Sequence, residues 1–172
     1  MNYSLFPPIL HVEPIERDTL NRCLVDWQHK MGAWTRPKFK EWLTALFHNG
    51  RPVAVMVATT LIRKRCAGLS REDAIELGRV CAVRPHINRA ALRLWREFIF
   101  PDICASYGCK AVISYQDAVL HSGDLYRFDG WTRIDTSRSG TDQRTGAKGR
   151  SKVIWAYGDL SSLENKKKKK KG

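Results

Sequence analysis

The chain has 172 residues, a length typical of one globular domain. Hydrophobic residues make up 43% and charged residues 27%, a balance that excludes disordered and collagen-like chains and predicts a packed core. No apolar run approaches the ~20 residues of a membrane span, and the first residues lack the pattern of a secretory signal, so we expect no membrane association. The five cysteines are odd in number and form no Cys-x-x-Cys pair, which argues against disulfides and zinc and favours a reducing compartment.

Basic residues outnumber acidic ones, and the formal net charge is +13. Six of the positive charges lie in the block Lys166–Lys171, and without that block the charge is still +7. A body of this charge favours an anionic partner such as a nucleic acid or a phosphate-bearing cofactor. We expect a single domain over residues 1–160 and a lysine-rich tail over residues 161–172, and the sequence leaves open whether the tail is native or engineered.

Apolar spacing and turn residues predict the elements of the first third of the chain. Asp18 or Thr19 can cap a helix whose apolar stripe is formed by Leu20, Leu24, Val25 and Trp27. Asn49-Gly50 is a turn signal, and the segment after it, rich in Val, Met and Thr, is typical of a buried strand. In chain order, the predicted segments are a strand at 9–12, this helix, a loop at 28–37, an amphipathic stretch at 38–47 and a strand at 52–62.

The rest of the chain predicts further strands and two more helices. A strand over residues 74–83 is broken by Arg84-Pro85-His86-Ile87-Asn88, and a helix follows from about Arg89 until Pro101 ends or kinks it. Strands at 110–115, 131–134 and 152–157 and a short helix at 121–128, stopped by Gly130, complete the order. The alternation predicts an α/β fold with a mixed sheet of about six strands flanked by helices.

The turn after the strand 74–83 is the first candidate site. Free backbone N–H groups and the positive end of a helix dipole suit a phosphate, and basic side chains stand beside them. An ordinary capped helix start is the alternative, because the turn contains no glycine-rich loop. The candidate binding residues here are Val83, Arg84, His86, Asn88 and Arg89.

Polar residues also crowd the exit of the strand 110–115, a place that binding sites favour. Tyr126 can donate a proton from its phenol, Asp117 can accept one or orient an amine, and His121 titrates nearest neutrality. Each residue taken alone has a structural alternative. Tyr126 can pack with its hydroxyl in water, Asp117 can cap the next helix, and His121 can lie on the surface.

Three further residues are candidates for the chemistry. His29 lies in a basic loop and is either a ligand or base, or simply solvated. Glu76 and Arg79 are three residues apart on one predicted strand and therefore point to opposite faces. Either of the two can enter a site while the other meets a helix, and a buried Arg79 needs a carboxylate or carbonyl partner.

The loop over residues 136–150 mixes basic side chains with Gly, Ser and Thr. This composition can follow a phosphate backbone while staying flexible, and a solvated loop is the alternative. The candidate nucleic-acid-binding residues are Arg138, Arg144, Lys148 and Arg150.

Two patterns in these segments resemble a known superfamily. Leu125-Tyr126-Arg127-Phe128-Asp129-Gly130-Trp131 resembles the Leu-Tyr-x-x-x-Gly-aromatic segment of the GCN5-related N-acetyltransferase (GNAT) superfamily. The segment Ile75 to Phe100 lies where that superfamily binds the pyrophosphate of coenzyme A. The resemblance implies a GNAT-like, largely antiparallel central sheet and acetyl-CoA or another acyl-CoA as cofactor.

A narrower resemblance is to the bacteriophage Mom-type DNA adenine modification proteins. It is carried by Leu77-Gly78-Arg79-Val80, Ser114-Tyr115-x-Asp117 and His121-x-Gly123-x-x-Tyr126. It implies action in the cytoplasm of an infected bacterial host, and bound iron with His29 and Tyr126 as ligands. The chain departs from the superfamily at one point, because Arg84-Pro85-His86-Ile87-Asn88-Arg89 replaces the usual Arg/Gln-x-x-Gly-x-Gly/Ala loop.

These observations predict a GNAT-type acyltransferase that modifies the exocyclic amine of a nucleobase, adenine in phage DNA, against restriction. Tyr126 protonates the departing thiolate, and Asp117 or Glu76 receives the amine proton, with Arg79 and His29 also assigned to catalysis. Ser114 joins the residues that bind acyl-CoA. Adenine has to flip out of the duplex, and the rings proposed to stack it are Trp34, Trp131 and Tyr115.

Two alternative functions remain open from the sequence. An acetyl-CoA-dependent N-acetyltransferase that acts on a small amine or a protein would use the same Tyr126. A nucleic-acid-binding module without chemistry would need only the basic residues. The sequence also leaves a homodimer open.

Overall fold

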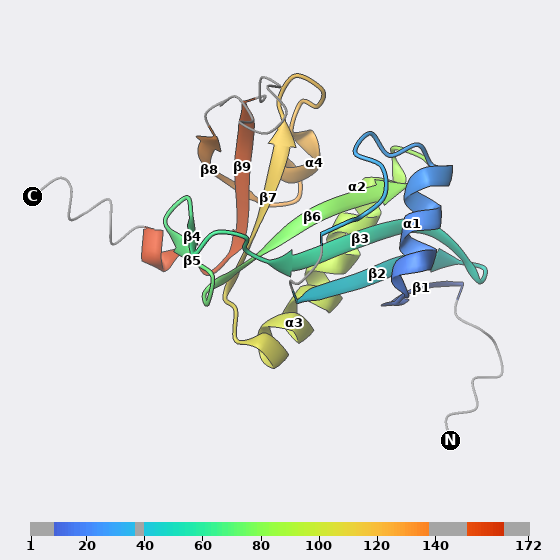
Figure 1. Cartoon of the computed structure of the whole chain (residues 1–172), viewed down its shortest axis with the longest axis horizontal. Helices are drawn as coiled ribbons and strands as arrows, with labels where there is room; N and C mark the ends of the chain where they lie inside the picture. The colour runs from blue at the N-terminus through green and yellow to red at the C-terminus, as the bar shows by residue number, and fades with distance from the viewer. Residues whose placement is uncertain (1–8, 37–39, 138–150, 164–172) are drawn as a thin grey trace, which may run out of the picture. The chain divides into compact units, whose positions relative to one another are not determined.

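The computed structural model describes residues 9–36, 40–137 and 151–163 (Figure 1). A sheet with the strand order β1-β2-β3-β6-β7-β9-β8 is flanked by helices. The pairs β1–β2, β2–β3, β7–β9 and β8–β9 are antiparallel, and β6–β7 is parallel. The predicted α/β class, with its largely antiparallel sheet, is confirmed, and the sheet has seven strands rather than six. No helix within the described residues is long and apolar enough to cross a membrane.

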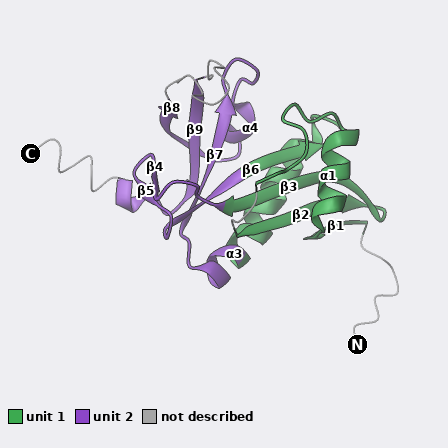
Figure 2. Ribbon diagram, viewed as in Figure 1, with its two compact units in different colours: residues 1–59, 78–102 green, residues 60–77, 103–172 purple. Residues whose placement is uncertain are grey.

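Residue contacts divide the chain into two compact units, and each is described by itself (Figure 2). The first unit comprises residues 1–59 and 78–102. It holds β1 (Leu10–Pro14), α1 (Arg17–Asp26), β2 (Glu41–His48), nearly all of β3 (Arg51–Thr60), the second half of β6 (Ala74–Ala82), α2 (Ile87–Leu94), a π-helix (Trp95–Ile99) and the start of α3 (Phe100–Tyr107).

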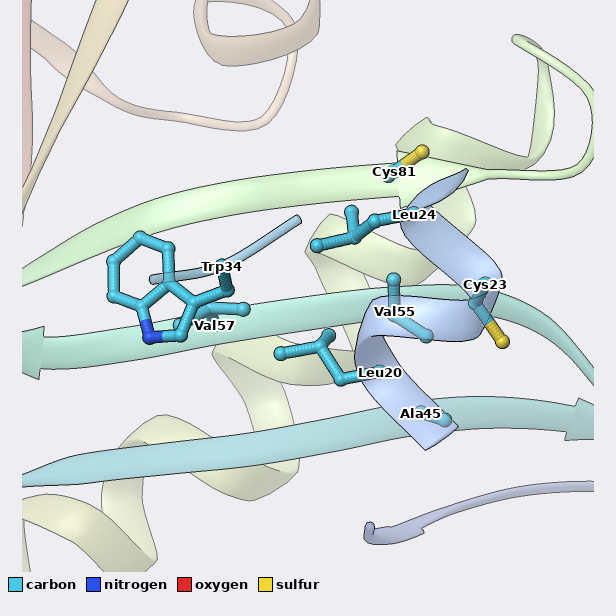
Figure 3. Packing of buried hydrophobic residues seen from close by; sticks show 8 residues of the cluster. All are labelled: Leu20, Cys23, Leu24, Trp34, Ala45, Val55, Val57 and Cys81. Atoms are coloured by element: carbon cyan, nitrogen blue, oxygen red, sulfur yellow. The ribbon is translucent and has the colours of Figure 1, made fainter. Parts of the chain in front are cut away.

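The core of the first unit lies where α1 covers β2 and β3. Leu20 and Leu24 of the helix are fully buried against Val55 and Val57 of β3, as Figure 3 shows. Trp34, from the loop after the helix, is buried beside them. Leu20 and Leu24 of the predicted stripe meet the sheet, because residues four apart lie on one face, and Trp27 packs against the same core. Val25 is 59% exposed, so its place on the stripe is wrong.

Two predictions in the first unit need correction. The described part of the amphipathic stretch predicted at 38–47 belongs to the strand β2 from Glu41 onward, in which Leu43, Ala45 and Phe47 face the core at a two-residue period. The sequence predicted that Pro101 ends or kinks its helix. The helix does not end at Pro101, and the kink stays a prediction. Pro101 lies in the first turn of α3, directly after the π-helix, where the i→i+5 pattern accommodates the lost N–H donor.

The second unit comprises residues 60–77 and 103–172. A small hydrophobic core contains Leu69, Ile113 and Ile154, and Leu160 and Leu163 pack against it. Leu163 thus lies against the fold although the predicted tail begins at residue 161. The elements are the hairpin β4 (Arg65–Cys66) and β5 (Leu69–Ser70), the first half of β6, the rest of α3, β7 (Ala111–Asp117), α4 (Asp124–Arg127), β8 (Thr132–Ser137) and β9 (Lys152–Gly158).

Gly158 ends β9 at a point where the backbones of β9 and β7 approach closely. Its φ is +104°, and a Cβ at this position would collide with the carbonyl oxygen of Lys110. The same carbonyl accepts the N–H of Asp159 at 2.9 Å, so it cannot move away without breaking a hydrogen bond. Glycine is required here for its backbone angle and for its lack of a side chain.

We expect Gly158→Ala to lower the free energy of unfolding by about 1–3 kcal/mol from backbone strain, with the collision adding to that loss. Gly130→Ala is the matched control, because Gly130 also has a positive φ, +77°, but a methyl group there would meet no atom within 4 Å. Urea unfolding of both variants measures the difference. Equal losses in the two variants would show that the close approach at Lys110 has no energetic effect.

Candidate active site

Tyr126 lies in α4 and is enclosed by aromatic rings. Its ring stacks on Trp155 of β9, with centroids 5.8 Å apart and planes 18° apart. Trp131 meets it edge-on at 5.3 Å. Only 9% of the tyrosine remains exposed, so its phenol sits in a dry environment.

The Tyr126 hydroxyl is the first member of a short chain of hydrogen bonds. Its oxygen lies 2.8 Å from Oγ of Ser114, which itself donates to the carbonyl of Leu77 at 2.8 Å. A carbonyl can only accept, so the single proton of Ser114 is committed to Leu77. Ser114 must therefore accept its other hydrogen bond, and Tyr126 donates to it.

This chain of hydrogen bonds begins where regular strand pairing stops. The parallel register of β6 and β7 joins Ala74–Glu76 to Ala111–Ile113. Ser114 is the next residue of β7, and it holds the next residue of β6, Leu77, through its side chain. Tyr126 thus marks the end of the parallel pairing.

The environment of Tyr126 keeps its phenol protonated. Burial raises the pKa of the phenol above its usual value of 10. At neutral pH the group is a hydrogen-bond donor with a proton to give.

The opposite face of β7 carries a second polar group. The Tyr115 hydroxyl lies 2.8 Å from Sγ of Cys66, and burial raises the pKa of both groups. Glu76, 4% exposed, stands opposite Ile113 in the register and interacts electrostatically with this pair. Because side chains alternate along a strand, Glu76 and Tyr115 lie on one face and Ser114 on the other.

The two carboxylates predicted to accept the amine proton therefore do not share a face with Tyr126. Asp117 is two residues after Tyr115 and therefore lies on the same face of β7. Its Oδ1 accepts the N–H of Val119 at 3.0 Å. That contact closes the turn after β7, whereas the sequence had offered Asp117 as a cap of the next helix, which begins only at Asp124. His121 is exposed, and its N–H is bound to the carbonyl of Asp117 at 3.1 Å. The roles of Asp117 and Glu76 as bases stay predictions.

Arg79 and His29 belong to the first unit. Arg79 places its guanidinium over the Trp34 ring, 5.1 Å from the centroid, and donates to the carbonyl of Gly78 at 2.7 Å. Nδ1 of His29 accepts the N–H of Met31 at 3.3 Å. Both side chains have structural contacts of their own, and their catalytic roles stay predictions.

The predicted cofactor turn lies at the start of α2, which begins at Ile87 and not at Arg89. Ile87 and Asn88 donate their N–H groups to the carbonyls of Arg84 and Pro85, at 3.0 and 3.2 Å, so the turn is closed by its own backbone. Val83 donates to Val53 at 2.9 Å. The side chains of Arg84, His86 and Arg89 are exposed around the helix start, and such cations fit a phosphate group.

Three other predictions concern partners. Arg138, Arg144, Lys148 and Arg150 lie outside the described residues. Trp34 and Trp131 are only 1% and 4% exposed, so the prediction that their rings stack a flipped base is wrong. Tyr115 is half-buried and its hydroxyl is engaged with Cys66.

The residues do not fit the iron implied by the narrower resemblance. Within the described part of the chain, no three His, Cys, Asp or Glu side chains gather as metal ligands. His29 uses Nδ1 for a backbone amide, and the phenol of Tyr126 is directed to Ser114.

Sequence reasoning missed Trp155 and the carbonyl of Leu77. Trp155 stands in the last predicted strand with no motif around it, and only the antiparallel register, which sets it opposite Ser114, places it at the site. A backbone carbonyl leaves no mark in a sequence. The available signal was the concentration of aromatic residues in the last two predicted strands, 131–134 and 152–157, which contain Trp131, Trp155 and Tyr157.

No family model and no curated protein matches this sequence. Solved structures match along most of the chain. Arabidopsis thaliana NAA60 with a bisubstrate analogue aligns with a TM-score of 0.64 at 12% identity, over 87% of this chain and 99% of that one. A GNAT family acetyltransferase from Elizabethkingia anophelis with acetyl-CoA bound aligns with a TM-score of 0.52 at 12% identity, over 89% and 100%. The chain has the GNAT fold.

A further GNAT-like neighbour in structure is the aminoglycoside 6'-N-acetyltransferase from Enterococcus faecium, with a TM-score of 0.58. Its identity is 10%, and the alignment covers 86% of this chain and 96% of that one. These identities are too low to carry residue roles across. The GNAT fold is therefore common to the chain and its neighbours, and the roles of individual side chains must be argued from the geometry above.

The raised pKa of Tyr126 predicts a loss of stability in alkali. At pH values below about 10, the pKa of tyrosine in the unfolded chain, Tyr126 is protonated in both the folded and the unfolded state. The buried phenol then makes its full contribution to the free energy of unfolding. Above that pH, the unfolded chain releases the proton more readily, so the free energy of unfolding falls as pH rises toward the folded pKa. Urea unfolding between pH 8 and pH 11 should show a shallower fall for Tyr126→Phe than for the wild type. Identical slopes would contradict the burial of this phenol.

Proposed function

We propose that the protein is an acyl-CoA-dependent N-acyltransferase in which Tyr126 is the proton donor. The observation that carries the proposal is a buried, protonated phenol at the end of the parallel β6–β7 pairing in a GNAT fold. The Elizabethkingia anophelis neighbour is a GNAT family acetyltransferase with acetyl-CoA bound, and this supports the choice of donor.

The reaction balances with one proton lost and one gained. An acyl-CoA supplies a thioester carbonyl, to which the amine nitrogen bonds as the carbon–sulfur bond breaks. Tyr126 gives its proton to the sulfur, and the amine gives up a proton to a base or to water. The Tyr126 hydroxyl donates to Ser114, so it must rotate away from Ser114 before its proton can be transferred. The Ser114 hydroxyl can rotate in turn and donate a hydrogen bond to the phenol oxygen.

The residues of the turn at α2 are proposed to bind the phosphates of the donor. Arg84, His86 and Arg89 are exposed and cationic or titratable, and Val83 and Asn88 border the same turn. Ser114 is proposed as a further residue that binds the donor, through its contact with Tyr126.

For the acceptor, we propose the exocyclic amine of adenine in DNA. The net charge of +7 without the lysine block, and the cations of the 138–150 segment, support a polyanionic substrate. The lone pair of this amine is delocalised into the ring, so positioning must supply much of the rate. Action on phage DNA in the host cytoplasm is part of the same proposal. A small amine or a protein amine is the alternative acceptor, and the Enterococcus faecium neighbour is named for an aminoglycoside.

Replacing the phenol tests the transferase. We expect Tyr126→Phe to lower the rate of thiol release from acetyl-CoA by ~10²–10⁴-fold, because the leaving thiolate loses its acid. Calorimetry should show that this variant still binds the donor, whereas replacing Arg84 and Arg89 together by Ala weakens binding. Undetectable donor binding by the wild type would overturn the proposal, and an unchanged rate would remove Tyr126 from the reaction.

DNA from cells that express the protein tests the acceptor. Digestion and mass spectrometry should reveal a modified deoxyadenosine with the wild type and none with Tyr126→Phe. In binding assays, a chain ending at Leu163 should keep its affinity for duplex DNA, and replacing Arg138, Arg144, Lys148 and Arg150 by Ala should flatten the log–log salt dependence by roughly 3–4. If binding vanishes with the tail and ignores these four residues, a small or protein amine becomes the acceptor.

A further inference from the structure

Gln116 lies beneath the start of α4, with both ends of its amide engaged. Its Oε1 accepts Nε1–H of Trp155 at 2.6 Å, and its Nε2 donates to the carbonyl of His121 at 2.6 Å. The indole can only donate and the carbonyl can only accept, so one orientation of the amide satisfies both. The side chain is 4% exposed, and losing either bond would leave a buried polar group unpaired.

At Gly123 the backbone lies in close contact with the side-chain amide of Gln116. It is the residue before α4, with φ at +85°, and its carbonyl accepts the N–H groups of Tyr126 and Arg127 at 3.1 and 3.0 Å. A Cβ here would lie 2.6 Å from Oε1 of Gln116 and 3.0 Å from the Trp155 ring. The backbone that starts the helix therefore rests directly on the Gln116 and Trp155 side chains.

Trp155 connects this support to the phenol. Its indole N–H holds Gln116, its ring edge faces Gly123, and its ring face stacks on Tyr126. The position of the tyrosine oxygen is thus set from two sides, by the backbone of α4 and by the stacked ring. The hydrogen-bond partner of the Tyr126 hydroxyl is Ser114, so Gln116 and Trp155 act on where the phenol lies rather than on its proton.

We propose that Gln116 and Trp155 are positioning residues that fix the Tyr126 hydroxyl for proton transfer. This inference rests on the proposed acyltransferase function and adds to it the residues on which the acid depends. Gln116 acts through the His121 carbonyl and Gly123, and Trp155 acts through stacking and through Gln116. Because a misplacement of about 1 Å can cost ~10²-fold in rate, loss of this support should lower kcat more than the KM for acyl-CoA.

The kinetic test is a double-mutant cycle. We expect Gln116→Leu to lower kcat by roughly 10–100-fold, and Trp155→Phe, which keeps a ring but loses the N–H donor, to do the same. In the Tyr126→Phe background, Gln116→Leu should have almost no further effect, because the group that it positions is gone. Thr59→Val is the matched control. It removes a buried hydrogen bond of 3.0 Å to the carbonyl of Lys40 and should lower stability without this kinetic pattern.

Gln116→Glu provides a variant of equal volume in case Gln116→Leu does not fold. A protonated glutamic acid can still accept from Trp155 and donate to the His121 carbonyl, whereas the ionised form can only accept. The ratio of its kcat to that of the wild type should therefore rise as pH falls. A ratio independent of pH, or a cycle in which the two losses multiply fully, would overturn the positioning role.

A readout without turnover separates this inference from the proposed function. With the five tyrosines labelled at 13Cζ, the Tyr126 resonance, assigned by its loss in Tyr126→Phe, should be a single narrow line in the wild type. In Gln116→Leu it should shift and broaden, and in Thr59→Val it should not. If the wild type transfers no acyl group, the proposed acyltransferase function is contradicted. The spectrum still tests whether Gln116 and Trp155 position Tyr126. An unchanged resonance would overturn the positioning even in an active enzyme.

Discussion

Ser114 has one proton to donate, and the site depends on where that proton goes. The carbonyl of Leu77 takes it, because β6 and β7 are no longer paired by their backbones at that point. This choice forces Tyr126 to donate to Ser114 and leaves the phenol oxygen able to accept a further hydrogen bond. A thiol or an amine approaching that oxygen would therefore meet an acceptor first and a proton donor only after the hydroxyl turns.

Alternation along β7 divides the polar residues of the second unit between two environments. Ser114 and Gln116 face the aromatic enclosure of Tyr126, while Tyr115 faces Cys66 and the buried Glu76. The two carboxylates thus lie on the other face of the sheet from the proton donor. A base role for Glu76 or Asp117 consequently requires water or the substrate to carry the proton. The geometry favours Tyr126 as acid far more directly than either carboxylate as base.

The sequence predicted the order of most elements from local patterns and singled out Tyr126 as a candidate, whose catalytic role stays a prediction. It did not predict β2, since its apolar residues also fit a helical stripe, and only pairing with β3 fixes the two-residue period. Trp34 and Trp131 were predicted as stacking rings, but their burial depends on the packing of the folded chain. Trp155 and Gln116 carry no motif, and Gly123 appeared only as one position of the resemblance, with no structural role assigned to it. The strand register and the backbone before α4 bring the three together beneath that helix.

In the proposed reaction the phenol and its support would serve the leaving group, which is the same whichever amine is acylated. Substitutions at Tyr126, Gln116 or Trp155 should therefore affect every acceptor alike, and the choice of acceptor must depend on other residues. The net charge of +7 favours DNA among the proposed acceptors, because each phosphate of DNA releases counterions when a cation contacts it, and the phosphates of an acyl-CoA donor would use part of the same charge. The basic composition is thus the physical argument for DNA, and the buried phenol is the argument for the chemistry. The two arguments are independent, so a modified base in DNA would require both to be correct.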